Sequence, residues 1–305
     1  VITNMGNQGH TYDGIRQLRE WYEADVLGQI TEVHSWIAGP AWNGGYFPRS
    51  VNLPLSVDPI PEGLDYDLWL GPNAMTPFHK EYHPKRWRAF TQFGTGTFGD
   101  WFCHVADAPV WLLDLYEPVS VEAEEVSGRS DLIAHDSVRV RYDFVNRGTK
   151  KPCSFYWHNG PKATPDLKEK WGLTRDLPQH GTIYKGEKAI ATTNHRSDSP
   201  RLVDIDQMKA LNKLKLPQKY ARVPGGPVRE FVRAVKGDGP TPGSNFDYAA
   251  PMTEVMLLGI IAARAGGKIE WDAKNMKITN RPELNVHLKE PVRKGWAYGE
   301  DLWAS

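Results

Sequence analysis

Alternating apolar and polar positions dominate the middle of this chain and predict strands there. The same alternation over residues 181–193 predicts a hairpin that turns near residues 185–187. Strands of this kind, joined by polar turns, favour a largely antiparallel sheet with one covered face. Outside the hairpin, strands are predicted at residues 1–6, 30–37, 118–127, 136–146, 153–159, 268–272 and 276–280.

Apolar residues at helical spacing predict the layer that covers this sheet. Ile15, Leu18, Tyr22 and Val26 form one apolar face of a helix that ends at Gly28. The pattern indicates an α+β fold, in which helices cover one face of a large, mostly antiparallel open sheet. A surface helix, a short amphipathic helix and a longer buried helix are also predicted, at residues 201–216, 228–239 and 247–266.

Residues 97–115 contain a predicted helix with clear start and break signals. Thr97 and Asp100 have the spacing of a capping box, which predicts a helix that begins directly after Thr97. Pro109 cannot donate a helical hydrogen bond, so we expect the helix to kink after Asp107 or to split there.

The polar face of this helix is the main candidate for chemistry. Asp100, His104 and Asp107 are spaced i, i+4 and i+7, so they share one helical face. A carboxylate one turn before a histidine can orient the imidazole and tune it as a general base. Two alternatives stay open. Either Asp100 only caps and His104 is an ordinary buried histidine, or both bind a divalent metal with Asp107 or His158 as third ligand.

Residues 40–93 are rich in proline, glycine and tryptophan and have little periodicity. An excursion of this length in a compact domain is usually functional. It ends in a basic and aromatic run around Arg86, Trp87 and Arg88, which either contacts a ligand or is a solvated turn.

The composition of the 305 residues narrows the classes of partner. Lysines plus arginines number 37, as do aspartates plus glutamates, so nothing favours nucleic acid or an acidic membrane surface. No run approaches about eighteen apolar residues, so we expect no membrane span. Cys103 and Cys153 lack the spacing of a metal site or of a disulfide scaffold.

Several longer segments stand in a distinctive order along nearly the whole chain: GNQGH, VLGQITEVHSW, GLDYDLWLGP, HPKRWRAF, GTGTFGDWFCHVADAPVWLL, EFVRAVKGDGPTPGSNFDYAAPMTEVMLLG and KIEWDAKNMKITN. In combination they resemble the Gfo/Idh/MocA oxidoreductases, named for glucose-fructose oxidoreductase and inositol dehydrogenase. The similarity is closest to the branch common in Bacteroidetes and Planctomycetes.

This resemblance implies two domains. Residues 1–29 would be the last strand and helix of a Rossmann domain, and residues 30–305 the substrate-binding and oligomerisation domain. The family's glycine fingerprint and its E-K-P motif would precede Val1, so we expect either a part of a longer protein or a remnant without redox chemistry. A twin-arginine signal, frequent in this branch, would also precede Val1, which leaves a cytoplasmic and a periplasmic location open.

The resemblance also implies a reaction. The family's catalytic aspartate and histidine fall on Asp100 and His104, and Asn7 and Gln8 would border the nicotinamide of NAD or NADP. His104 would take the proton of a hydroxyl that loses hydride to the nicotinamide, while Asp100 orients His104.

The expected substrate is a sugar, a polyol or a glycoside. Tyr46, Trp87 and Arg88 are the candidates for stacking and hydrogen bonding to it. His158, at a strand end, either faces the same cleft or is a buried structural histidine. Some relatives use transient oxidation for elimination or epimerisation without net redox change, and a non-catalytic sugar-binding or assembly domain is a further alternative. We expect a homo-oligomer, a dimer or tetramer formed through the sheet face.

Overall fold

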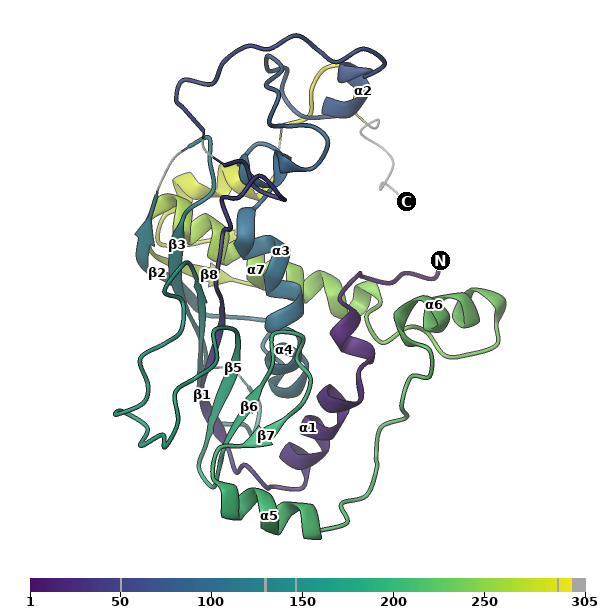
Figure 1. The fold of residues 1–305 in the computed structure, drawn as a ribbon, viewed down its shortest axis with the longest axis vertical. Coiled ribbons are helices and arrows are strands. Elements are labelled where there is room, and N and C mark those ends of the chain that lie inside the picture. Colours follow the sequence, from purple (N-terminus) through teal and green to yellow (C-terminus); the bar gives the residue numbers. More distant parts are fainter. Residues whose placement is uncertain (50, 129–130, 146, 290, 298–305) are drawn as a thin grey trace.

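A nine-stranded sheet carries the fold (Figure 1). The computed structural model describes residues 1–49, 51–128, 131–145, 147–289 and 291–297. β1 runs parallel to β4, and the other neighbouring pairs are antiparallel, which confirms the predicted mostly antiparallel sheet. In spatial order the strands are β7 (Arg201–Leu202), β6 (Ile190–Thr193), β5 (Gly181–Gly186), β1 (Ile30–Ile37), β4 (Cys153–Asn159), β3 (Ser137–Phe144), β2 (Ser120–Ser127), β8 (Gly267–Asp272) and β9 (Lys277–Ile278).

The helices follow the apolar pattern, with one change. Residues 201–216, predicted as one helix, begin with β7, and a helix starts only after Asp204, whose carboxylate accepts from the Gln207 N–H at 2.7 Å. The α-helices are α1 (Asp13–Glu23), α2 (Tyr66–Leu70), α3 (Gly96–Val105), α4 (Asp107–Leu113), α5 (Ile205–Lys213), α6 (Gly226–Lys236) and α7 (Phe246–Ala265), and the 3₁₀ helices are η1 (Gln8–Thr11), η2 (Arg86–Ala89) and η3 (Pro282–Leu288).

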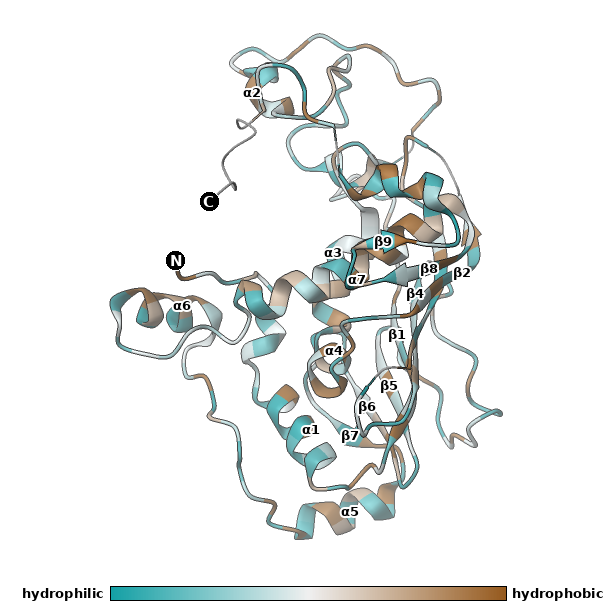
Figure 2. Ribbon diagram, turned by 180° about the vertical axis from the view of Figure 1, so that it is seen from behind, coloured by the Kyte–Doolittle hydropathy of each residue, from teal (hydrophilic) through white to brown (hydrophobic). Residues whose placement is uncertain are grey.

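Helices α1, α3, α4 and α7 lie on one side of the sheet, as Figures 1 and 2 show from opposite directions. Their apolar faces meet the inward side chains of the strands, such as Tyr142, Phe155 and Trp157, in the main core. On the opposite face, the segment between β4 and β5 covers part of the sheet, where Trp36 packs with Trp171. The predicted covering of one face by helices is therefore confirmed.

Helix α7 approaches the sheet closely at Gly259, where an added Cβ would lie 1.8 Å from the Tyr142 hydroxyl. By length and composition alone, α7 could cross a membrane, with a mean hydropathy of 1.3, but core helices of soluble proteins also meet this test. In this fold, Val255, Leu258 and Ala262 of α7 are buried in the main core, and the helix contacts β2 and β3.

The excursion of residues 40–93 forms a lobe with its own small core, at the top of Figure 1. Tyr66, Phe78, Tyr82 and Phe90 are buried together there. The lobe returns to the main body through η2, which contacts α3. The predicted candidates Trp87 and Arg88 therefore lie where the lobe meets α3.

The first residues differ from the prediction. Residues 1–6 form no strand, and the Met5 N–H donates to the Ser244 carbonyl at 2.8 Å instead of pairing in a sheet. A strand needs a neighbour for its backbone groups, and this segment lies beside the start of α7 rather than beside a strand. Residues of α1, among them Ile15 and Leu18, pack in the same core as the sheet.

Helix α3 also starts earlier than predicted. Its N-cap is Thr95, which makes no side-chain capping bond. Thr97 is buried inside the helix, and its hydroxyl has no partner among the described residues. The backbone of Gly96 has a positive φ of 63°, so the chain enters the helix through a glycine turn rather than through a capping box.

The predicted split occurs, but at Ala106, before Asp107 rather than after it; Pro109 has no N–H to donate to the Val105 carbonyl. Two buried hydroxyls replace the missing helical bonds. Ser197 Oγ accepts from the Ala108 N–H at 3.0 Å and lies 3.0 Å from the His104 carbonyl, to which it donates. Thr182 Oγ donates to the Val105 carbonyl at 3.0 Å. Ser197 thus stands inside the helical ladder between α3 and α4.

We predict that Ser197→Ala lowers the free energy of unfolding by about 1–3 kcal/mol, because it leaves a buried N–H and a buried carbonyl without partners. Urea denaturation measures the change. Ser199→Ala is the matched control, since Ser199 is exposed and has nearly the same φ, 55° against 57°. Equal losses in both variants would contradict a role for the Ser197 hydroxyl.

Candidate functional site

Helix α3 has a buried face and a partly exposed face. Phe98, Phe102 and Val105 are buried in the main core. Asp100 and His104 therefore remain on the half-exposed side of the helix, one turn apart. Within the described residues, no hydrogen bond joins these two side chains, and each has its own surroundings.

Asp100 lies in a group of residues that were predicted as substrate contacts. Arg88 Nε is 3.6 Å from Asp100 Oδ2, and the guanidinium lies over the rings of Trp87 at 4.5 Å and Tyr46 at 5.1 Å. Tyr46 is 60% exposed, so its ring is accessible from outside. The structure brings Tyr46, Trp87, Arg88 and Asp100 together, and we call them the Arg88 group.

Burial raises the pKa of Asp100 to about 6, although the Arg88 guanidinium opposes this rise. A carboxyl with this pKa changes its protonation state close to neutral pH. Such a group can donate or accept a hydrogen bond at a ligand hydroxyl.

His104 lies in a second group, which we call the Trp101 group. The Trp101 ring lies 5.7 Å from the His104 ring, 5.7 Å from the His195 ring and 5.4 Å from the Arg196 guanidinium. Arg196 Nη1 donates to Gln8 Oε1 at 2.9 Å. The Trp101 group thus consists of side chains from α3 and from the loop after β6, and it contacts Gln8, a predicted cofactor residue.

Burial lowers the pKa of His104, and the neighbouring cation Arg196 lowers it further. His104 is therefore neutral at pH 7 and able to accept a proton. Its Nδ1 is buried with no partner among the described residues. A histidine with these properties suits general-base chemistry better than a histidine with both nitrogens engaged.

Asn7 fits one part of a nicotinamide site. Its side chain is 1% exposed, Ser244 Oγ donates to its Oδ1, and its Nδ2 has no partner among the described residues. A buried amide N–H₂ of this kind could donate to a carboxamide oxygen. Asn7 and Gln8 therefore stay the candidates in this chain for contact with a nicotinamide.

Asp107 lies beyond the helix break and has hydrogen-bond partners of its own. It is fully buried, and its Oδ1 lies 2.8 Å from His10 Nδ1 and accepts from the Tyr248 hydroxyl at 2.5 Å. The described part of the chain contains no group of three or more His, Cys, Asp or Glu side chains placed to bind a metal. The structure thus does not bring the ligands of the metal alternative together.

His158 lies on the opposite face of the sheet from His104. Its Nε2 is 3.0 Å from His34 Nδ1, and His34 Nε2 is 2.9 Å from Glu32 Oε1. Hydrogen bonding to His34 lowers the pKa of Glu32 to about 2, while burial lowers the pKa of both histidines. An ionised Glu32 accepts from His34, which then accepts from His158, so His158 Nδ1 is left unprotonated beside a cavity of about 590 Å³.

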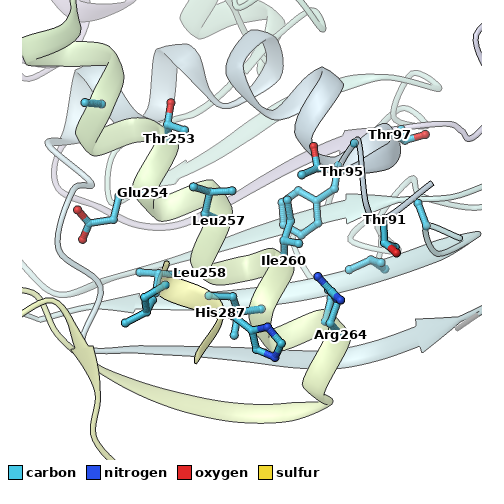
Figure 3. Close-up of a pocket in the computed structure, with 18 of the residues that line it drawn as sticks. Thr91, Thr95, Thr97, Thr253, Glu254, Leu257, Leu258, Ile260, Arg264 and His287 are labelled. Atoms are coloured by element: carbon cyan, nitrogen blue, oxygen red, sulfur yellow. The ribbon is translucent and has the colours of Figure 1, made fainter. Parts of the chain in front are cut away.

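A larger cavity of about 950 Å³ lies between α7, η3 and the start of α3 (Figure 3). Its wall is mostly apolar, with Leu257, Leu258 and Ile260 of α7, and Glu254 and Arg264 stand at its edge. Asp100 and His104 do not line it, and it contacts the α3 segment through other residues: Thr95, Thr97 and Phe98.

Trp101, His195 and Arg196 were not predicted as site residues. For His195 and Arg196 the signal in the sequence is a polar loop, NHRSDS, directly after the hairpin strand at residues 190–193. Nothing in the sequence says that this loop lies beside a helix about ninety residues earlier, because tertiary contacts, among them the Ser197 bonds to α3 and α4, bring the two together.

Comparison with known proteins agrees with the fold. Residues 13–150 match the sequence model of the Gfo/Idh/MocA oxidoreductase family, C-terminal alpha/beta domain. This match includes Asp100 and His104 and supports the family resemblance; it begins at residue 13, inside the segment that was predicted as the end of a Rossmann domain. No curated protein matches the chain in sequence.

Solved structures resemble the chain at low sequence identity. An NAD-binding protein from Listeria innocua is 15% identical, with a TM-score of 0.51, over 88% of this chain and 63% of its own. An oxidoreductase from Thermotoga maritima is 14% identical, with a TM-score of 0.49, over 88% of this chain and 61% of its own. The WlbA dehydrogenase from Bordetella pertussis, solved with NADH and UDP-GlcNAcA, is 14% identical, with a TM-score of 0.49, over 89% and 64%. The chain thus spans less than two thirds of these structures, and the likeness concerns the fold alone.

We predict that Arg88→Gln raises the pKa of Asp100 above its wild-type value of about 6, because the only opposing cation is removed. A carboxyl-carbon NMR titration measures it. Lys85→Gln is the control, since Lys85 also lies over Tyr46, at 5.1 Å, but does not influence the Asp100 carboxyl. An unchanged Asp100 pKa in Arg88→Gln would contradict the pairing.

Asp100→Asn should make the protein more stable at pH 8 than wild type, and this gain should vanish near pH 4. Because the folded state binds the Asp100 proton more tightly than the unfolded state, wild type loses stability as the pH rises from about 4 through 6. The pKa shift corresponds to a gain of up to about 3 kcal/mol. Urea denaturation across pH measures it, with the exposed Asp206→Asn as control. A pH-independent difference would refute this expectation.

Proposed function

We propose that this chain is the substrate-binding part of an NAD- or NADP-dependent oxidoreductase that transfers hydride between the nicotinamide and a hydroxyl of a sugar, polyol or glycoside. In this proposal, residues 30–305 bind the substrate, and residues 1–29 belong to the end of a dinucleotide-binding domain. The family match over residues 13–150 supports the reaction class.

The observation that carries the proposal is the state of His104. It is neutral, its Nδ1 is buried and unpartnered, and it lies on the helix that the family match includes. A neutral imidazole beside Arg196 is ready to accept a proton, whereas a histidine with an engaged carboxylate on each side would already be charged.

In the proposed reaction, each residue of the site has a distinct role. His104 accepts the proton of the substrate hydroxyl. Asp100, one turn away and close to half-ionised near pH 6, hydrogen-bonds a neighbouring hydroxyl, and Tyr46 and Arg88 hold the sugar against the lobe. Asn7 and Gln8 would hold the amide end of a nicotinamide, which would supply the hydride acceptor.

Two further expectations stay with the proposal. A homo-oligomer, a dimer or a tetramer, would use the sheet face that the helices leave open. Elimination or epimerisation without net redox change, or sugar binding without catalysis, remains the alternative for the same site, and the variants below separate catalysis from binding.

In the full-length protein, His104→Ala should lower turnover by about 10²–10⁴-fold, which is the usual contribution of a general base, while sugar binding is retained. Initial rates with NAD and NADP over a panel of sugars and polyols measure turnover, and calorimetry measures binding. His83→Ala is the histidine control, because His83 is exposed in the lobe. Unchanged turnover in His104→Ala would remove it from the mechanism and leave the binding-domain alternative.

A further inference from the structure

Arg196 differs from the other arginines of the site region in having no acidic partner. Arg88 is paired with Asp100, Arg86 with Glu81 and Arg222 with Glu20. Within the described ranges of the chain, Arg196 makes one side-chain hydrogen bond, to the neutral Gln8, and no ion pair. A guanidinium carries five N–H donors, so the other donors of Arg196 have no acceptor among the described residues and are available to a ligand.

The position of Arg196 is fixed by its own turn. The Asn194 side chain accepts from the Arg196 N–H at 2.8 Å and from the Asp198 N–H at 3.1 Å. Ser197 anchors the same turn between α3 and α4, and an added Cβ on Gly9 would lie 2.2 Å from the Arg196 carbonyl oxygen. Because the turn fixes its backbone, the half-buried guanidinium of Arg196 loses little conformational freedom when it binds a ligand.

The charges around Arg196 leave its cation uncompensated. The groups that influence His104 are Arg196, Asp107 and His195, and His195 is in turn influenced by Arg196 and His180. Burial lowers the pKa of both His180 and His195, so they are neutral at pH 7. Asp107 is already engaged by His10 and Tyr248.

We infer that Arg196 binds an oxyanion, a carboxylate or a phosphate group, carried by the sugar ligand that His104 and the Arg88 group receive. The inference rests on the proposed function and narrows its substrate class to acidic sugars such as uronates or sugar phosphates. Arginine presents the planar, two-pronged donor geometry that both groups accept. The Trp101 ring lies 5.4 Å from the Arg196 guanidinium and 5.7 Å from the His104 ring, so both side chains stand beside the same ring.

Binding of three probes to the full chain tests this inference without requiring turnover. Calorimetry with D-glucuronate, D-glucose 6-phosphate and D-glucose should show at least one of the two anions binding about tenfold or more tighter than glucose, since one charged hydrogen-bonded pair contributes this much. The two anions distinguish carboxylate from phosphate. Arg196→Gln should abolish the preference and Arg196→Lys should retain part of it.

Lys85→Gln is the control for general electrostatic attraction and should keep the preference. A second readout is the His104 ring, observed by NMR: its pKa should rise in Arg196→Gln, and also in wild type when the anion covers the guanidinium. Equal binding of all three probes, or a preference that survives Arg196→Gln, overturns the inference.

NADH is the last probe, because a cofactor phosphate is another source of the same chemistry. If Arg196→Gln weakens NADH but leaves the anionic sugars unaffected, the oxyanion belongs to the cofactor and the substrate assignment is wrong. This failure differs from failure of the proposed function, which would show as unchanged turnover in His104→Ala.

Discussion

The site depends on one local constraint, the missing N–H of Pro109. Without it, the carbonyl groups at the end of α3 lose their helical donors, and buried carbonyls must find others. Thr182 from β5 and Ser197 from the loop after β6 supply them. A break in one helix thereby fixes two distant segments against it. The same bonds set the backbone of His104 and bring Arg196 beside Trp101.

This arrangement gives Asp100 and His104 different electrostatic surroundings. Asp100 and His104 are one helical turn apart, yet they have different neighbours. Asp100 lies beside Arg88 of the lobe, whereas His104 lies near Arg196. Burial favours the neutral form of both side chains. A pair of neutral or nearly neutral groups can exchange protons with a ligand near pH 7 without the cost of separating a tight ion pair. The predicted loss of stability on ionising the buried Asp100 carboxyl is typical of functional sites, which often reduce the stability of a fold.

On the opposite face of the sheet, burial and hydrogen bonding also set the protonation of a group of titratable side chains. Glu32, His34 and His158 form a hydrogen-bonded chain in which the ionised carboxylate fixes one tautomer at each histidine. The sheet separates His158 from His104, because adjacent residues of a strand point to opposite faces. Trp157 faces the helices and the main core, whereas His158 faces outward.

The sequence by itself determined the elements and the covered face of the sheet, since alternation, helical spacing and Pro109 act over short stretches of chain. It also placed Asp100 and His104 one turn apart on one helix. Only the tertiary structure decided the partners of these residues. Residues 1–6 were predicted as a strand but have no neighbouring strand to pair with, and Thr97 has a capping pattern but lies inside the helix. Arg196 lies near His104 because tertiary contacts, among them the Ser197 bonds to α3 and α4, hold its loop there. Contacts between residues so far apart in the chain depend on burial and hydrogen-bond satisfaction in the folded core, which no local pattern encodes.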